Sequence, residues 1–424
     1  MVNRVDDEGE LSWGRSKVEH PGGRLDDPLL TDGIKDKNLF VICHSYNYFQ
    51  KDPFDLIAPH VASIYVSVRT NPFAEIGKHL PILRNEIFSS VDKIDRTNTP
   101  ENTHVYSTPI WYLPTDRGYK NLGQKQYNRV TSLIQKKEII YDLIHCHFVW
   151  SAGYAGARLK EEFGGPFVVT AHGYDIYSLP FMDDEWREKI EYVLNTADHI
   201  ITVSQSNLAC INRLNVSTPV SVIPNGFRSD IFYPRDAVSC RTLLNLPHDR
   251  KIVLTVGYFD PIKGHTYLIE AAREIISKRK DVLFVIVGLG KLQTTLEDQI
   301  RSLGLEDHFL FAGGKPHSEI PLWMNASDIF VLPSLNEGNP TVMFEALGCG
   351  LPFVGTRVGG VPEIITSETC GLLVEPADPK GLAEKILLAL EKEWDREAIL
   401  AYADQFAWES IAERIIGVYN QVLE

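Results

Sequence analysis

Residues 329–355 read IFVLPSLNEGNPTVMFEALGCGLPFVG, and this stretch decides the fold. It begins with a short apolar run at Ile329–Leu332 and continues through a loop rich in Gly, Asn and Pro. A helix-like segment follows at Thr341–Gly348, and a second apolar run comes after Pro352. Strand, loop, helix and strand in this order predict a βα unit of a parallel sheet. The helix start would present free backbone N–H groups beyond the strand end, which favours an anion there.

Two glutamates lie eight positions apart in this stretch, Glu337 in the loop and Glu345 in the helix-like segment. Because eight residues make a little over two helical turns, we expect the two carboxylates to share one side of the segment. Carboxylates beside an anion site suit a ligand that carries both hydroxyls and phosphates. A nucleotide sugar is a ligand of that kind.

The stretch resembles the Glu-x7-Glu signature of the retaining glycosyltransferases of family 4. The residues that match are Pro333-Ser334, Glu337-Gly338, Glu345-Ala346 and Gly350-Leu351-Pro352. The resemblance implies an α/β protein of the GT-B fold, with two doubly wound Rossmann-like domains and a cleft between them. It also implies transfer of a sugar from a nucleoside diphosphate sugar to an acceptor hydroxyl, with retention of anomeric configuration.

Composition agrees with a soluble globular protein. The 424 residues suffice for two or three domains, and 44% hydrophobic and 23% charged residues are ordinary proportions. A net charge of −14 argues against general nucleic-acid binding. The six cysteines are scattered without a CxxC pair, which predicts a reduced, cytoplasmic protein without a disulfide framework. We see neither an apolar run long enough for a membrane span nor the apolar core of a signal peptide.

The alternation of apolar runs with helix-like segments predicts two parallel sheets. Residues 1–36 are acidic, punctuated by Gly and Pro and without hydrophobic period, so we expect a disordered or loosely packed tail. The expected organisation continues with an acceptor-side domain at 37–220, a linker at 221–250, a nucleotide-sugar-binding domain at 251–405 and a helix at 406–424 that crosses back to the first domain.

On the donor side, the resemblance assigns a role to each matching residue. Glu337 would hold the hydroxyls of the donor sugar and favour the charged transition state, and Glu345 would bind the ribose. Lys263 would neutralise the leaving diphosphate. Further donor contacts are expected at Gly257 and Gly288, at the base-framing loop of Lys315, and at the backbone around Gly338, Asn339, Thr341 and Val342.

One departure from the family pattern concerns the diphosphate. The family usually has an Arg after the glycine that corresponds to Gly257, and this chain has Tyr258 there. One of the usual two cations is therefore missing, and Lys291 or Lys315 would have to replace it.

On the acceptor side, the segment at 170–175, TAHGYD, resembles the family's His-Gly-x-Asp segment. It implies that His172 approaches the donor sugar and the reaction centre. The loop at 44–49 lacks the glycines that the family commonly has there, which leaves the acceptor open. We take His44, His147 and Asp175 as acceptor-side candidates.

A metal site is the alternative for the two histidines that flank Cys146. His145 and His147 point to the same side of a strand, but neither cysteines nor carboxylates cluster near them in the sequence. We therefore expect no metal at these histidines, and the resemblance implies no catalytic metal and no other cofactor.

Two other functions stay open. A sugar-nucleotide epimerase can share this architecture, and a catalytically silent sugar-nucleotide-binding protein would account for Tyr258 and for the atypical first loop. The expected partners are a nucleotide-sugar donor and a carbohydrate, lipid-linked or small-molecule acceptor, without nucleic acid.

Residues 117–137, which we call the basic segment, carry six cations and no acid: Arg117, Lys120, Lys125, Arg129, Lys136 and Lys137. The segment is either a solvated helix face or a contact with the cytoplasmic face of an anionic membrane.

Overall fold

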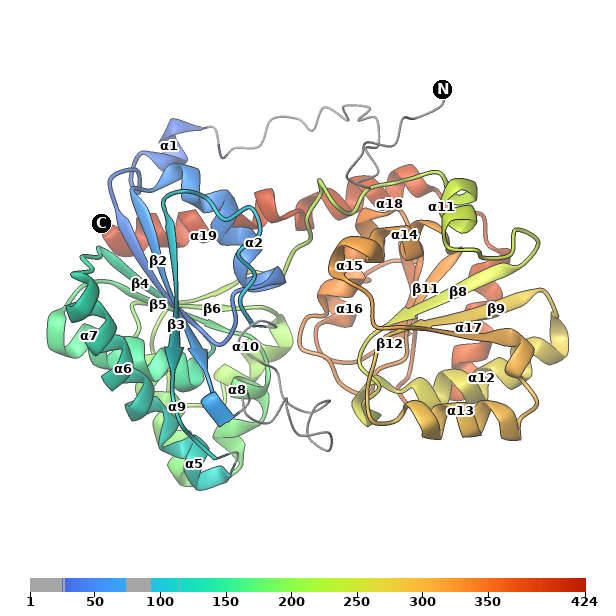
Figure 1. Cartoon of the computed structure of the whole chain (residues 1–424), viewed down its shortest axis with the longest axis horizontal. Helices are drawn as coiled ribbons and strands as arrows, with labels where there is room; N and C mark the ends of the chain where they lie inside the picture. The colour runs from blue at the N-terminus through green and yellow to red at the C-terminus, as the bar shows by residue number, and fades with distance from the viewer. Residues whose placement is uncertain (1–24, 26, 74–92, 114) are drawn as a thin grey trace.

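The computed structural model describes residue 25 and residues 27–73, 93–113 and 115–424. They form two α/β domains that lie side by side (Figure 1). Each domain is built around one sheet in which the recorded strand pairings are parallel, with helices packed on it. The predicted pair of doubly wound domains is confirmed. Its physical origin is the run of short, continuously apolar strands that must be covered on both faces.

The first domain holds a seven-stranded sheet in the order β3-β2-β1-β4-β5-β6-β7. Its strands are β1 (Asn38–Cys43), β2 (Ser63–Thr70), β3 (Thr103–Pro109), β4 (Leu143–His147), β5 (Phe167–Ala171), β6 (His199–Thr202) and β7 (Val220–Val222). Its helices are α1 (Pro28–Thr31), α2 (Tyr48–Ile57), α5 (Asp116–Lys120), α6 (Leu122–Lys137), α7 (Tyr154–Phe163), α8 (Tyr174–Tyr177), α9 (Asp184–Thr196) and α10 (Gln205–Ile211). The edge strand β3 was not expected, because its sequence THVYSTP contains only scattered apolar residues.

The second domain holds a six-stranded sheet in the order β10-β9-β8-β11-β12-β13. Its strands are β8 (Lys251–Val256), β9 (Val282–Val287), β10 (Phe309–Gly313), β11 (Ile329–Leu332), β12 (Phe353–Thr356) and β13 (Gly371–Val374). Its helices are α11 (Ala237–Leu243), α12 (His265–Lys278), α13 (Gln293–Ser302), α14 (Ile320–Asn325), α15 (Thr341–Gly348), α16 (Val361–Ile364), α17 (Pro379–Glu391) and α18 (Arg396–Ala403). The expected linker at 221–250 thus contains the end of β7 and the helix α11.

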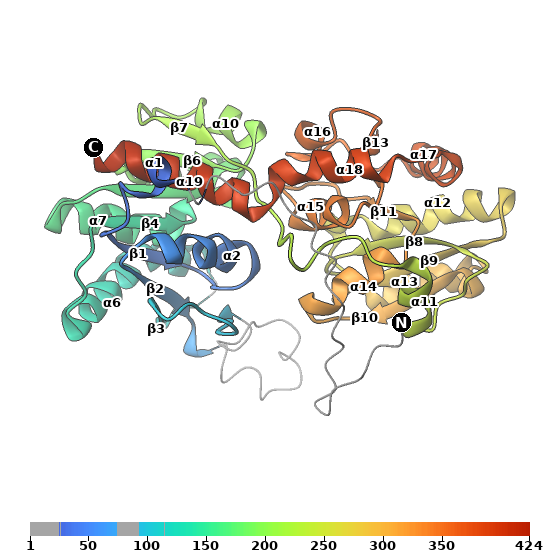
Figure 2. The same ribbon diagram turned by 90° about the horizontal axis from the view of Figure 1, so that it is seen from above.

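The last helix, α19 (Trp408–Leu423), runs from the second domain onto the first (Figures 1 and 2). A backbone exchange at Phe227 marks the crossing: Phe227 donates to the carbonyl of Phe406 (3.1 Å) and accepts from the N–H of Trp408 (3.0 Å). Farther along α19, Ile411 and Tyr419 are buried in the core of the first domain. The chain therefore crosses between the domains twice, once before and once after the second domain in sequence, and the two crossing segments lie side by side.

Residues 27–36 differ from the expected loose tail. They include α1, which packs against α19 (Figure 2), and the side chain of Ile34 is completely buried. Asn420 of α19 donates from its side chain to the carbonyl of Leu30 at 2.8 Å. The prediction is wrong here because the segment is too short to show a hydrophobic period, and its partner lies almost 400 positions away in the sequence. The rest of the predicted tail, residues 1–24 and 26, lies outside the described residues.

Three sequence-level expectations concern cysteines, metals and membranes. All six cysteines are free thiols. In the described part of the chain, His, Cys, Asp and Glu side chains do not gather in threes in a way that would hold a metal ion. The helices of this same part are too short or too polar to cross a bilayer.

Candidate active site

A cavity of about 300 Å³ lies where the two domains meet. The loops that line it follow β4 and β5 in the first domain and β11 in the second, so the carboxyl ends of both sheets contribute, as expected for open parallel sheets. Phe49 and the crossover residue Asn225 complete the lining. The full set is Phe49, Phe148, His172, Gly173, Tyr174, Tyr177, Asn225, Glu337, Gly338, Asn339, Pro340 and Thr341.

Glu337 lies at the floor of the second-domain side. Its Oε1 is 2.7 Å from the Nζ of Lys263 and 2.7 Å from the Oγ of Ser334, and its side chain is only 8% exposed. Lys263 ends a short 3₁₀ turn, Pro261–Lys263, that follows β8. The backbone N–H of Leu335 donates to the carbonyl of Ile262 at 2.7 Å and ties the two loops together. A carboxylate and a cation are thus held together beside the cavity.

Close packing accounts for two of the glycines predicted on the donor side, Gly288 and Gly338. A Cβ on Gly257 would lie 3.9 Å from the aliphatic carbons of the Lys263 side chain, so Gly257 lies beside that side chain without crowding it. A Cβ on Gly288 would lie 1.9 Å from the carbonyl oxygen of Gly257, so glycine is required there by the neighbouring strand end. On Gly338 a Cβ would lie 2.9 Å from the carbonyl oxygen of His172 in the other domain. The two domains therefore approach each other closely at Gly338.

The N-terminus of α15 faces this cavity. Its N-cap position is Pro340, and the described residues provide no side-chain cap. The backbone N–H groups of Thr341 and Val342 belong to the first turn, where a helix leaves donors free for an anion. Thr341 lines the cavity, whereas the Val342 side chain packs on the core of the second domain.

Asn339 also joins the two domains, while the donor contact predicted for its backbone N–H stays a prediction. Its side-chain oxygen accepts from the backbone N–H of Asn225 at 2.8 Å, and its carbonyl accepts from the Asn225 side chain at 2.9 Å. Asn225 belongs to the first crossover between the domains, so this pair fixes the crossover to the loop that holds Glu337.

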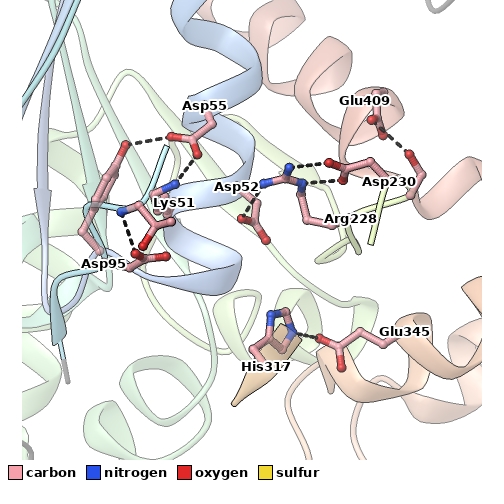
Figure 3. Close-up of polar contacts among 12 residues, drawn as sticks. Lys51, Asp52, Asp55, Asp95, Arg228, Asp230, His317, Glu345 and Glu409 are labelled. Atoms are coloured by element: carbon pink, nitrogen blue, oxygen red, sulfur yellow. Dashed lines mark hydrogen bonds and ion pairs between the residues drawn. The ribbon is translucent and has the colours of Figure 1, made fainter. Parts of the chain in front are cut away.

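The two glutamates of the signature do not share a helix face. Glu337 precedes α15, so the helical period does not apply to it, and Glu345 alone lies on the helix. The Oε1 of Glu345 is 2.8 Å from the Nε2 of His317 (Figure 3). Among the residues that line the cavity, Glu345 is absent. The helical period on which the expectation of a common side was based therefore does not extend to Glu337, and the common side stays a prediction.

His317 lies between the two domains. Its ring packs on Tyr48 of the first domain (4.3 Å between ring centroids) and on Phe232 (5.0 Å). Burial lowers the pKa of His317, but the hydrogen bond and the charge of Glu345 outweigh burial and raise the pKa above its ordinary value. A protonated His317 therefore pairs with Glu345 more readily than an exposed histidine would.

Lys315 lies away from the cavity. Its Nζ is 4.0 Å from a carboxylate oxygen of Glu319 and 5.4 Å from the ring centre of Trp323. Lys315 is not among the residues that line the cavity, and its replacement of the missing arginine stays a prediction.

Four histidines cluster under the first-domain side of the cavity. The Nδ1 of His147 is 2.9 Å from the Nε2 of His172, and the ring of His44 stacks on Phe148 at 4.5 Å. His145 bridges the hydroxyls of Thr170 (2.7 Å) and Tyr419 (2.6 Å).

Burial keeps this cluster uncharged. It lowers the pKa of His147 to about 3. Burial, together with the repulsion that a protonated His147 would exert, also holds the pKa of His172 well below its usual range. At neutral pH His172 is a neutral imidazole, and its buried Nδ1 has no hydrogen-bond partner among the described residues. His172 can therefore donate or accept one hydrogen bond to a ligand, but it cannot supply charge.

Asp175 holds the loops that carry this cluster. Its Oδ1 accepts from the N–H of Gly173 at 2.9 Å and its Oδ2 accepts from the N–H of Val149 at 2.7 Å. Burial raises the pKa of the Asp175 carboxyl, and these backbone hydrogen bonds oppose that rise. Predicted as an acceptor-side residue, Asp175 is instead directed at the backbone and positions His172.

Charged side chains join the domains at two places outside the cavity. The carboxylate of Glu363 in α16 accepts from the backbone N–H groups of Gln205 (2.6 Å) and Ser206 (2.8 Å) at the start of α10. Arg228 of the crossover lies 3.6 Å from Asp52 of α2 and pairs with Asp230 (Figure 3). These contacts stabilise the described arrangement of the two domains.

Sequence reasoning missed the aromatic wall of the cavity: Phe49, Phe148, Tyr174 and Tyr177. Three of these follow predicted residues closely, since Phe148 comes after His147, and Tyr174 and Tyr177 come after Gly173. Their positions just past strand ends were the available signal. Asn225 offered none, because its partner lies 114 positions away.

Comparison with known families gives two matches that divide the chain. Residues 241–406 match the family described as Glycosyl transferases group 1, and residues 86–230 match Glycosyltransferase Family 4. An uncharacterized glycosyltransferase of Methanocaldococcus jannaschii is 30% identical over 329 residues, which cover 77% of this chain and 87% of that protein. A D-inositol 3-phosphate glycosyltransferase of Acidothermus cellulolyticus is 29% identical over 304 residues, with 67% and 68% covered.

Solved structures share the arrangement of the two domains. Sucrose-phosphate synthase from Thermosynechococcus elongatus superposes with a TM-score of 0.68 at 23% identity and covers 91% of this chain and 99% of its own. The HepE protein of Anabaena, solved in complex with UDP, gives a TM-score of 0.70 at 22% identity, with 91% and 100% covered. At such identities the likeness concerns the fold.

Proposed function

The chain belongs to the glycosyltransferases of group 1 and family 4, and we propose that it transfers a sugar from a nucleoside diphosphate sugar to an acceptor hydroxyl with retention of anomeric configuration. The predicted family and its GT-B fold are confirmed by these matches and by the two parallel sheets. Neither alternative, the epimerase or the catalytically silent binding protein, is favoured by the comparisons.

The observation that carries the proposal is the contact between Lys263 and Glu337 at 2.7 Å, beside a cavity that also receives the N-terminus of α15. An ammonium group has three donor hydrogens. Lys263 can therefore keep its bond to Glu337 and still donate to a phosphate oxygen. Helix N-termini attract anions through their free N–H groups and their dipole. Together they suit a diphosphate leaving group.

The remaining groups suit the sugar. Glu337 is a largely buried carboxylate and stabilises the positive charge that develops at the anomeric carbon as the diphosphate leaves. Neutral His172, on the opposite wall, offers one hydrogen bond to a sugar hydroxyl or to the acceptor. The aromatic wall excludes water and provides flat apolar surfaces for a sugar ring.

We propose that the leaving group needs no divalent metal, because Lys263 and the α15 N-terminus supply the positive charge. Activity in excess EDTA tests this point. Strict dependence on an added divalent ion would contradict it.

The test of the overall reaction starts from UDP, the ligand named for the Anabaena structure. Calorimetry with UDP and other nucleoside diphosphates identifies the preferred base, because it measures the binding of each one to the folded chain directly. Donors with the preferred base are then incubated with an acceptor panel, and the anomeric proton coupling of the product is read by NMR. A product with inverted configuration would contradict retention, and donor conversion without an acceptor would favour the epimerase.

The membrane contact expected for the basic segment stays a prediction. The segment forms α5 and α6, and one of its cations is already compensated: the Nζ of Lys120 lies 2.7 Å, 3.1 Å and 3.3 Å from carboxylates of Asp183, Glu185 and Asp116. Sedimentation with anionic and neutral liposomes at low and high salt tests the contact, because salt screens surface charge. Binding that persists after the exposed cations are changed to Gln would contradict it.

A further inference from the structure

Arg69 is a buried cation at the carboxyl end of β2. Only 5% of the residue is exposed, and the register of β1 with β2, Cys43 opposite Val68, sets it beside His44. Its Nη1 donates to the Oγ of Ser151 at 3.1 Å, and its guanidinium lies 5.3 Å from the ring centre of Tyr112. Its Nε is buried without a hydrogen-bond partner among the described residues.

Lys93 is a second cation at the same place. The N–H of Tyr46 donates to the carbonyl of Lys93 at 2.6 Å, and Tyr46 and Ile94 form a parallel bridge. These contacts fix Lys93 beside the end of β1. Burial, followed by the charge of Arg69, lowers the pKa of Lys93 to about 8, and the Cys43 thiol opposes the change in part.

Among the described residues, no carboxylate pairs with these two cations, in contrast to other enclosed cations of this protein. Lys51, 3% exposed, pairs with Asp55, and the guanidinium of Arg241 lies 2.8 Å from Asp328. Within the described part of the chain, Arg69 and Lys93 make no ion pair with a carboxylate, and the Ser151 hydroxyl on Arg69 is neutral. Burying charge without a partner is costly. In a chain with a net charge of −14, such an excess of positive charge indicates that a ligand supplies the anion.

The location connects this pair with the reaction centre. His44, which lies beside Arg69, stacks on Phe148, and Phe148 lines the cavity and contacts the ring of His172 at 4.7 Å. All of these residues belong to the first domain. The diphosphate of a donor has its own cation, Lys263, in the second domain. The anion at Arg69 is therefore a different one.

We propose that Arg69 and Lys93 bind an anionic group of the acceptor, a phosphate monoester or a carboxylate, and thereby hold the acceptor hydroxyl toward His172. A planar guanidinium matches two oxygens of either group, and an ammonium adds a third contact. This inference rests on the proposed glycosyl transfer and names the class of its acceptor. Neutral sugars and alcohols would be poor acceptors.

The first experiment is calorimetry on the full chain with four probes: inorganic phosphate, D-inositol 3-phosphate, glucuronate and unsubstituted inositol. We expect binding of at least one anionic probe and much weaker binding of inositol. Arg69→Gln and Lys93→Gln should each lower the affinity of that anionic probe about 10-fold or more, as for loss of a charged hydrogen bond. The exposed first-domain cation Arg129, changed to Gln, is the matched control and should have little effect. The phosphate and glucuronate arms distinguish the two anion classes.

Binding of UDP separates this proposal from the reaction itself. Arg69→Gln and Lys93→Gln should bind UDP within about twofold of wild type, which also shows that they fold. If no anionic probe binds the wild type, or if both variants bind the probes as the wild type does, the acceptor site is refuted while the transferase proposal stands. Absence of UDP binding and of transfer from every donor would refute the transferase proposal instead.

A pH series with glucuronate gives a readout that a structural role for Lys93 would not change. Glucuronate keeps one charge from pH 6 to pH 9. The groups that face Lys93 are Arg69, the Cys43 thiol, whose pKa burial raises, and His44, whose pKa burial lowers. Among the described groups at this place only Lys93 should titrate in this range, so the affinity for glucuronate should fall as pH rises through about 8. The step should disappear in Lys93→Gln and persist in Arg69→Gln; an unchanged step in Lys93→Gln would contradict the assignment.

Discussion

Changing Glu337 to Gln separates binding from chemistry in this active site. The substitution keeps the shape of a side chain that is only 8% exposed and removes its charge. In the wild-type chain the Oε1 of Glu337 lies 2.7 Å from both the Nζ of Lys263 and the Oγ of Ser334, and the amide oxygen of Gln can keep both hydrogen bonds. We expect the fold to tolerate the change. The affinity for UDP should stay the same or rise, whereas kcat should fall.

The magnitudes follow from what the carboxylate does in each state. In the free enzyme it holds Lys263 through a charged hydrogen bond worth about 1.5–3 kcal/mol, and a neutral one is worth about 0.5–1.5 kcal/mol. In the variant the hydrogen bond that holds Lys263 is therefore weaker by roughly 1 kcal/mol, which makes Lys263 more available to a diphosphate. The affinity for UDP should be unchanged or up to about fivefold higher. In the transition state the lost charge should lower kcat about 10²-fold or more, as for other preorganised electrostatic groups.

Calorimetry with UDP and single-turnover kinetics with the preferred donor measure the two quantities. Ser334→Ala is the matched control, because it removes the other hydrogen bond to the same oxygen and leaves the charge. It should lower kcat far less than Glu337→Gln. Equal losses of UDP affinity and turnover would make Glu337 a ligand anchor, and an unchanged kcat would refute its role in the transition state.

Three further predictions concern single groups. Lys263→Ala should weaken nucleoside diphosphate binding by about 1.5–3 kcal/mol and free nucleoside binding far less, by calorimetry. The raised pKa of His317 means that its pairing with Glu345 stabilises the fold fully below the unfolded pKa of about 6.5, and that this contribution is lost as pH rises through the folded pKa. Urea unfolding of wild type and His317→Gln should therefore differ most at pH 6 and converge by pH 9; a constant difference would exclude the linkage. Gly288→Ala places a Cβ 1.9 Å from the Gly257 carbonyl oxygen and should lower the free energy of unfolding by about 1–3 kcal/mol or more, whereas Ala at the open position Gly417 should not.

Local patterns were sufficient for most of the fold and for the donor side. Short continuous apolar runs predict buried parallel strands wherever they occur, so β1, β2, β4, β5, β6 and the strands β8–β12 were visible in the sequence. The segment from Ile329 to Gly355 encodes its strand, turn and helix within one βα unit. Lys263 and Glu337 each follow a strand of the same sheet, and parallel strands bring their carboxyl ends to one edge. Such contacts follow from chain order and period alone.

Contacts between distant segments could be decided only by tertiary structure. The helical period does not reach Glu337, which precedes α15, and only tertiary structure brings Glu345 to His317, 28 positions away. Ile34 looked like part of a loose tail until α19 covered it. Arg69 and Lys93 are unremarkable charges in the sequence, and only the packing of β1 and β2 places them near each other without a described carboxylate partner. The physical reason is that periodicity records which face of an element is buried, whereas the partner on that face depends on how separate elements pack.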